Sequence, residues 1–131
     1  MMVDSSAWVE FLRATGSREH LRIKKALNER TPLLLCNTVF QEVLQGAQNS
    51  TDMLRLEQGL SHLVRVEPAN LFAQARMAAH LYARCRWSGF TLRSAGDCMI
   101  AALAIELKQP VLHRDRDFDH IAAVDLRLKF V

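Results

Sequence analysis

The chain has 131 residues, and half of them are hydrophobic, which is enough for one domain with a buried core. Its formal charge of +3, from 17 basic and 14 acidic residues, permits an anionic partner without requiring one. No apolar stretch reaches the roughly 18 residues that a membrane-spanning helix needs. Met1-Met2-Val3 is too short to be a signal peptide. We therefore expect one cytoplasmic domain over residues 1–131.

Short apolar segments alternate with amphipathic segments along the chain. Strands are predicted at residues 1–3, 32–36, 63–66 and 111–113, with a fifth, edge strand over 125–131. Helices are predicted at residues 5–13, 18–29, 37–48, 51–60, 69–86, 94–107 and 118–122. Strands that alternate with helices are typical of an α/β fold with a parallel sheet covered on both faces.

Cysteine usage indicates a reducing compartment. Cys36, Cys85 and Cys98 are odd in number, form no C-x-x-C pair and lie in apolar segments. Free cysteine is among the residue types most often buried. We expect three buried thiols and no disulfide.

Four acids stand near the predicted strand ends or at the start of apolar helices. Asp4 and Asp115 follow strands directly, and Glu42 lies in the first turns after the second strand. Asp97 begins the helix that leads into the fourth strand. Ligands bind at the carboxyl ends of parallel strands, and converging carboxylates need a cation between them. Oxygen ligands favour Mg²⁺ or Mn²⁺ over zinc, so the pattern indicates a divalent-metal site for phosphate chemistry.

Each of these acids also has an ordinary structural alternative. Asp4 is a possible helix N-cap, and one acid of Asp115 and Asp117 could cap a helix while the other binds metal. Ser94-Ala95-Gly96-Asp97 resembles a capping box. The helix that Asp97 begins is nevertheless apolar all round, and a lone carboxylate on a buried face is unfavourable unless it is paired or metal-bound.

Glu42 has a solvated surface position as its alternative. Residues 38–41 form a predicted capping box in which Gln41 reaches back to Thr38, so Glu42 is not needed as a cap. Gly46, one turn further on, leaves room over the Glu42 side chain.

Hydroxyl and guanidinium groups flank the acids. A phosphodiester needs positive clamps as well as a metal, although arginines more often line solvated faces. The candidate substrate-binding residues are Ser5, Ser6, Arg93, Arg114 and Arg116. The five histidines show no zinc-site spacing, and no phosphate-binding glycine loop is present.

Four segments in order resemble the PIN-domain ribonucleases, and most of all the VapC-type toxins of bacterial toxin–antitoxin pairs. The segments are Val3-Asp4-Ser5-Ser6-Ala7-Trp8, residues 38–46 (TVFQEVLQG), Asp97-Cys98-Met99-Ile100-Ala101-Ala102, and residues 113–118 (HRDRDF). The resemblance covers essentially the whole chain. Two departures stand out: the first loop reads Asp-Ser-Ser where Asp-Thr-Ser or Asp-Thr-Asn is usual, and the last segment offers both Asp115 and Asp117.

The resemblance implies a three-layer α/β/α fold and an Mg²⁺- or Mn²⁺-dependent endoribonuclease that acts on structured RNA, often tRNA. It also implies a homodimer and a VapB-like antitoxin. The family's catalytic acids carry over onto Asp4, Glu42, Asp97 and Asp115, with Asp4, Asp97, Asp115 and Asp117 as candidate metal ligands. The alternatives are a catalytically silent PIN-like module that binds RNA or protein, and a metal phosphatase. The phosphatase is disfavoured because Asp-x-Asp is absent after the first strand.

Overall fold

The computed structural model describes residues 1–131 as a four-stranded sheet and seven helices. The strands are β1 (Met2–Val3), β2 (Leu34–Leu35), β3 (Val64–Arg65) and β4 (Val111–Leu112). The helices are α1 (Ser5–Leu12), α2 (Arg18–Asn28), α3 (Asn37–Gln45), α4 (Ser50–Leu60), α5 (Leu71–Trp87), α6 (Ala95–Glu106) and α7 (Arg116–Val124). The predicted alternation of strands and helices is confirmed.

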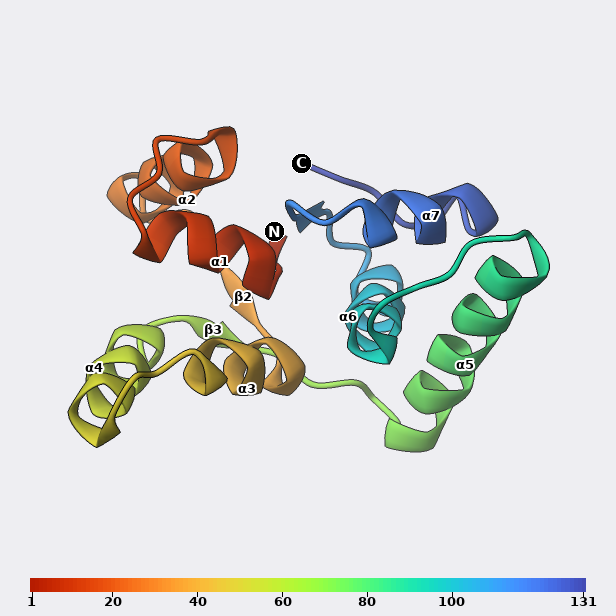
Figure 1. Cartoon of the computed structure of the whole chain (residues 1–131), viewed down its shortest axis with the longest axis horizontal. Helices are drawn as coiled ribbons and strands as arrows, with labels where there is room; N and C mark the ends of the chain where they lie inside the picture. Colours follow the sequence, from red (N-terminus) through yellow and green to blue (C-terminus); the bar gives the residue numbers. More distant parts are fainter.

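All strand pairs are parallel, in the order β3-β2-β1-β4. From β1 the chain adds β2 and then β3 on one side of the sheet, and it then crosses back to add β4 on the other side of β1. Right-handed crossovers place the helices before and after that return on opposite faces of the sheet. Figure 1 shows α1 to α4 together in the left half of the view and α5 to α7 in the right half. The architecture is the predicted α/β/α arrangement.

The fifth strand, predicted over residues 125–131, is reduced to one parallel bridge between Val111 and Phe130. The Val111 N–H donates to the Lys129 carbonyl at 2.9 Å, and the Val131 N–H donates to Val111 at 3.1 Å. The residues before this bridge form a turn held by Asp125, which accepts the Arg127 N–H at 3.1 Å. That turn leaves too little extended chain for a full strand.

The core lies around β1, β4 and α6. The four residues of the two strands are at most 1% exposed, and α6 is buried on nearly all sides, as its uniformly apolar sequence predicts. The three cysteines are free and buried, which confirms that expectation. No helix combines the length and the apolar character that crossing a membrane would require.

Three helices near the core begin at side-chain caps. Asp4 accepts the Ser6 N–H at the start of α1, Ser94 accepts the Gly96 N–H at α6, and Asp115 accepts the Asp117 N–H at α7. The capping box predicted at Thr38 is wrong. Because β2 turns into α3 at once, the extended Cys36 is the N-cap without a side-chain bond, and Thr38 is already inside the helix.

Candidate active site

Acids meet where β1 and β4, two neighbouring strands, give way to helices. Asp4 caps α1 directly after β1, and its N–H donates to the Leu112 carbonyl of β4 at 2.9 Å. Asp115 and Asp117 lie at the beginning of α7, after β4. Asp97 lies in the first turn of α6. The N-terminal ends of three helices thus place their positive dipole ends near these carboxylates.

The closest approach is among Asp97, Asp115 and Asp117, which each offer a carboxylate oxygen within 4.8 Å of the others. Asp117 is 1% exposed and Asp97 is 6% exposed, whereas Asp115 is half-buried. Asp4, predicted as a metal ligand, lies outside this closest group. Both acids of the last segment, Asp115 and Asp117, belong to it.

Several of the buried oxygens have no hydrogen-bond partner. They are Asp4 Oδ1, Glu42 Oε2, Asp97 Oδ2 and Asp117 Oδ1. A buried carboxylate oxygen without a donor is strongly unfavourable, so such atoms are uncommon outside functional sites. Four of them on neighbouring acids leave an all-oxygen set of the kind that hard divalent cations prefer.

Electrostatic strain is greatest at Asp97. Burial raises the pKa of Asp97 to about 7, and the negative charges of Asp4, Asp115, Glu42 and Asp117 add to the effect. Each of these causes disfavours the ionised form of Asp97. A cation among the carboxylates would favour their ionised forms and so oppose this rise in pKa.

Asp4 is held by Ser6. The Ser6 N–H donates to Asp4 Oδ2 at 2.9 Å, and the Ser6 hydroxyl donates to the same oxygen. The Arg114 N–H in turn donates to the Ser6 hydroxyl at 2.9 Å, which ties the loops after β1 and β4 together. Burial raises the pKa of Asp4, and the two bonds from Ser6 oppose that shift.

Glu42 approaches the first turn of α6 through a gap left by Gly96. A methyl group at Gly96 would lie 3.0 Å from Glu42 Oε1 and 3.1 Å from the Ser94 hydroxyl. Burial raises the pKa of Glu42, Ser5 opposes the shift through a hydrogen bond, and Asp4 adds to it. The glycine that makes room for Glu42 is therefore Gly96. Gly46, which sequence reasoning singled out, is the C-cap of α3.

The three candidate arginines occupy different places. The Arg93 side chain contacts Asp115 and Asp117. Arg114 pairs with Glu10 at 3.3 Å and Glu19 at 3.4 Å, which connects the loop after β4 to α1 and α2. Arg116 is exposed at the beginning of α7 and forms no ion pair. Of the three, Arg116 is the one whose guanidinium is not engaged with a carboxylate.

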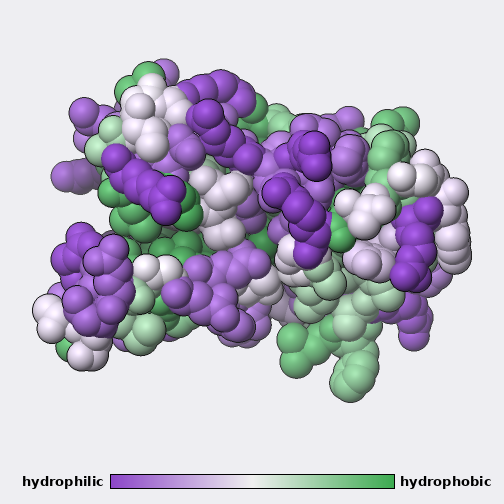
Figure 2. Space-filling model, in the orientation of Figure 1, coloured by the Kyte–Doolittle hydropathy of each residue, from purple (hydrophilic) through white to green (hydrophobic).

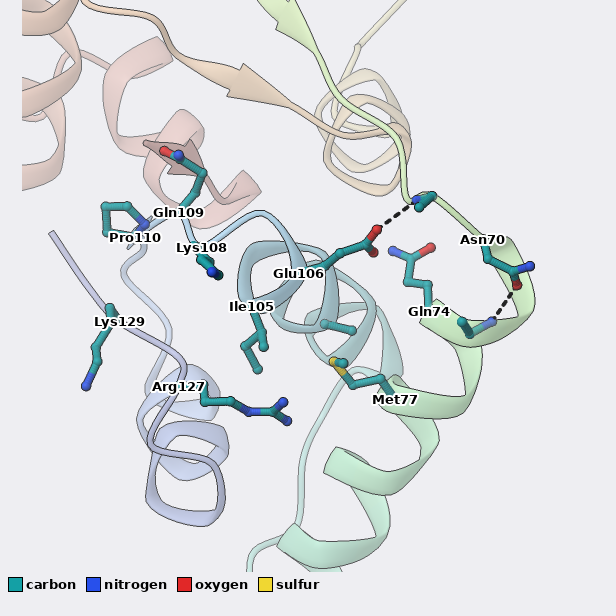
Figure 3. A pocket seen from close by; sticks show the side chains of 13 residues that line it. Asn70, Gln74, Met77, Ile105, Glu106, Lys108, Gln109, Pro110, Arg127 and Lys129 are labelled. Carbon is teal, nitrogen blue, oxygen red and sulfur yellow. Dashed lines mark hydrogen bonds between the residues drawn. The ribbon is translucent and has the colours of Figure 1, made fainter.

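A cavity of about 690 Å³ lies away from the acids. Figure 3 shows it between the beginning of α5, the end of α6 and the C-terminal segment, with Gln74, Met77 and Ile105 among its walls. Pro110, before β4, also lines it, so it is at the amino end of that strand, opposite Asp115. Its volume suits a ligand, but none of the candidate site acids reaches it.

The chain matches the PIN domain family over residues 1–124. It therefore belongs to the PIN-domain family, whose fold and acidic site the preceding features describe. Within that family the similarity is to VapC ribonucleases. The chain is 41% identical over 128 residues to VapC ribonuclease Mb1587 of Mycobacterium bovis and to Ribonuclease VapC11 of Mycobacterium tuberculosis. The aligned part covers 95% of this chain and 92% of each relative.

A solved structure supports the same fold. The crystal structure of FitAcB from Neisseria gonorrhoeae matches with a TM-score of 0.66, over 99% of this chain and 96% of that one. At 18% identity this likeness concerns the fold alone. The resemblance to VapC-type PIN-domain ribonucleases is thus confirmed by sequence.

Proposed function

We propose that the protein is a toxin endoribonuclease that uses Mg²⁺ or Mn²⁺ to cleave structured RNA, with tRNA as the expected substrate. The observation that carries this proposal is the cluster of buried carboxylates with unpartnered oxygens. The similarity to VapC ribonucleases over nearly the whole chain supports ribonuclease chemistry.

Asp97, Asp115 and Asp117 would hold the ion, with Asp4 and Glu42 beside them. A divalent ion at such a site lowers the pKa of water and polarises a phosphodiester. Ser6 fixes Asp4 and Ser5 supports Glu42, so both carboxylates are positioned to orient water or accept its proton. Arg93 and Arg116 are proposed to contact RNA phosphates.

The test is cleavage of total RNA by the purified protein with Mg²⁺, Mn²⁺ or EDTA, followed by sequencing of the new 5′ ends. We expect discrete cuts within tRNA that disappear in EDTA. RNA binding without cleavage in excess Mn²⁺ would instead identify a catalytically silent PIN-like module. Cleavage that persists unchanged in EDTA would refute the metal mechanism.

A VapB-like antitoxin is proposed as the protein partner. Figure 2 shows hydrophobic surface in a recess on the left, between the α1–α2 pair and the α3–α4 pair. Several large apolar side chains of these helices are exposed, among them Leu12, Leu27 and Leu54. We propose that an apolar segment of the antitoxin packs there. Both this partner and the RNA substrate would meet the protein in the cytoplasm.

The beginning of α5 is the proposed homodimer surface. Leu71 is 67% exposed and Phe72 is 86% exposed, and Figure 2 shows a hydrophobic projection at this place. The cavity of Figure 3 lies beside them, lined by Ala73 and Met77. A projecting apolar pair next to an apolar groove is self-complementary under a twofold axis.

Light scattering after size-exclusion chromatography tests this surface. Phe72→Ser should yield monomers, whereas Trp87→Ser, at the other end of α5 and similarly exposed, should leave the dimer intact. A wild-type monomer, or a Phe72→Ser dimer, would contradict the proposal.

A further inference from the structure

Arg93 forms ion pairs with Asp115 and Asp117, two of the three acids that approach one another most closely. Its guanidinium donates to Asp115 Oδ1, and its Nε lies 3.6 Å from Asp117 Oδ2. Its backbone N–H donates to Asp117 Oδ2 at 2.8 Å. Arg93 lies in the loop before α6, next to the Ser94 cap. One residue therefore contacts the acids through both a fixed backbone group and a movable side chain.

No other arginine or lysine pairs with these three acids. The nearest other cationic candidate is His120, whose Nδ1 is 3.9 Å from Asp117 Oδ1. The Asp115 N–H donates to His113 Nδ1 at 3.2 Å, and His113 Nε2 faces Asp119, which is outside this group. Arg93 is thus the one arginine or lysine that is paired with this cluster.

The Arg93 side chain is 62% exposed, and its ion pairs are with Asp115 and Asp117 alone. Because water solvates the exposed guanidinium, its attraction to the half-buried Asp115 and the buried Asp117 is screened, and each ion pair is weak. A divalent cation interacts more strongly with the same oxygens, since it carries twice the charge and Asp97 can join Asp115 and Asp117 around it. Asp115 Oδ1 cannot coordinate the ion and keep its present hydrogen bond from the Arg93 guanidinium at the same time.

We propose that Arg93 is a built-in counter-cation, which neutralises Asp115 and Asp117 in the metal-free protein and which a divalent ion displaces on binding. The inference rests on the proposed metal site. The backbone bond from Arg93 to Asp117 stays in place, so the side chain pivots about a fixed point. The released guanidinium remains beside the metal, where a phosphodiester would bind. Metal binding would thereby free the positive group that the substrate needs.

Metal titration of the intact protein without RNA tests the competition. Arg93→Gln removes the competing group, and Arg116→Gln is the matched control, because Arg116 carries the same charge near the same acids but forms no ion pair. By isothermal titration calorimetry, Arg93→Gln should bind Mn²⁺ about two- to fivefold more tightly than Arg116→Gln. Without metal, Arg93→Gln should melt at a lower temperature than Arg116→Gln.

A direct readout comes from the Nε–H signal of Arg93 in ¹⁵N-labelled full-length protein, identified by its absence from Arg93→Gln. Addition of Mg²⁺ should shift this signal towards the position of a solvated arginine and speed its exchange with water. Arg93→Lys keeps the charge but not the planar geometry, so its Mn²⁺ affinity should fall between those of the wild type and Arg93→Gln.

Two results would overturn the inference. Equal or weaker Mn²⁺ binding by Arg93→Gln relative to Arg116→Gln would mean that Arg93 does not compete with the ion. Absence of Mn²⁺ binding in every variant would refute the metal site itself, and the inference with it. Displacement of Arg93 by Mg²⁺ in a protein that cleaves no RNA would uphold the inference and count against the proposed function alone.

Discussion

Two buried aspartates of this protein have the same exposure and opposite surroundings. Asp97 and Asp125 are each 6% exposed. Asp125 accepts from Arg127 Nε at 3.0 Å and Nη2 at 2.7 Å, and Arg84 lies 3.7 Å away. Asp97 has no cation, and its Oδ2 has no partner. The pKa of Asp125 is lowered, chiefly by its bonds to Arg127, whereas burial and neighbouring acids raise the pKa of Asp97 to about 7.

The comparison distinguishes Asp125, an acid that stabilises the fold, from Asp97, an acid whose surroundings suit a bound cation. Arg127 and Arg84 satisfy Asp125 within the chain, so its charge contributes to stability as it stands. The charge of Asp97 opposes folding until something positive enters the cluster. The exposed fraction therefore does not distinguish a structural acid from a functional one. The hydrogen-bond and ion-pair partners of each carboxylate oxygen do.

The largest expected effect is that of Asp97→Asn, which removes the charge but keeps the size. RNA cleavage should fall by at least about a thousandfold, because a central acid of the site is lost. The metal-free variant should melt at a higher temperature than the wild type near neutral pH, because repulsion with Asp4 and Asp115 is relieved. Cleavage assays and thermal melts in EDTA measure both. A metal-free variant less stable than the wild type would contradict this view of Asp97.

The second prediction concerns pH. Folded Asp97, with its pKa raised to about 7, keeps its proton up to about that pH, whereas in the unfolded chain it releases the proton near its ordinary pKa of 3.8. Between these values the folded state binds more protons, so the stability of the metal-free protein should fall as the pH rises. From about pH 5 to about pH 7 we expect this residue to remove about 2 kcal/mol of unfolding free energy. Urea titrations of wild type and Asp97→Asn in EDTA give the difference, and parallel curves would refute the assignment.

Asp125→Asn should behave in the opposite way to Asp97→Asn. Loss of the charged bonds to Arg127 should lower the free energy of unfolding by about 1–3 kcal/mol. The rate of RNA cleavage per folded molecule should not change, since Asp125 is not among the acids that influence Asp97. Denaturant titration and single-turnover cleavage test the two halves, and a loss of cleavage without a loss of stability would break the comparison.

The smallest predicted effect is at Gly96. In Gly96→Ala the new methyl group meets Glu42 Oε1 at 3.0 Å, so the flexible carboxylate must shift. Displacing a positioned group by a fraction of an ångström should slow RNA cleavage by about tenfold, with little change in stability. Gly59→Ala in α4 is the control, because a methyl group there meets nothing within 4 Å. Equal cleavage rates in the two variants would show that the position of Glu42 is unimportant.

Local sequence patterns were sufficient to predict the elements and their order. The apolar runs around Val3, Leu35 and Leu112 became strands of a parallel sheet, and the uniformly apolar segment after Asp97 became the buried helix α6. The caps at Asp4 and Ser94 were recognisable because capping depends on residues only two or three positions apart. The predicted fifth strand was reduced to a bridge because the turn at Asp125 takes up the chain before it.

Residue types and their spacing also placed the acids at one edge of the sheet, since parallel strands share their carboxyl ends. Which acids come closest, Asp97 with Asp115 and Asp117, depended on how α6 and α7 pack across the core. The packing of α6 with α7 also brought Arg93 onto the acids, and the packing of α3 against α6 brought Gly96 under Glu42. Distances between side chains on different elements follow from strand register and helix packing, which no local run of residues encodes.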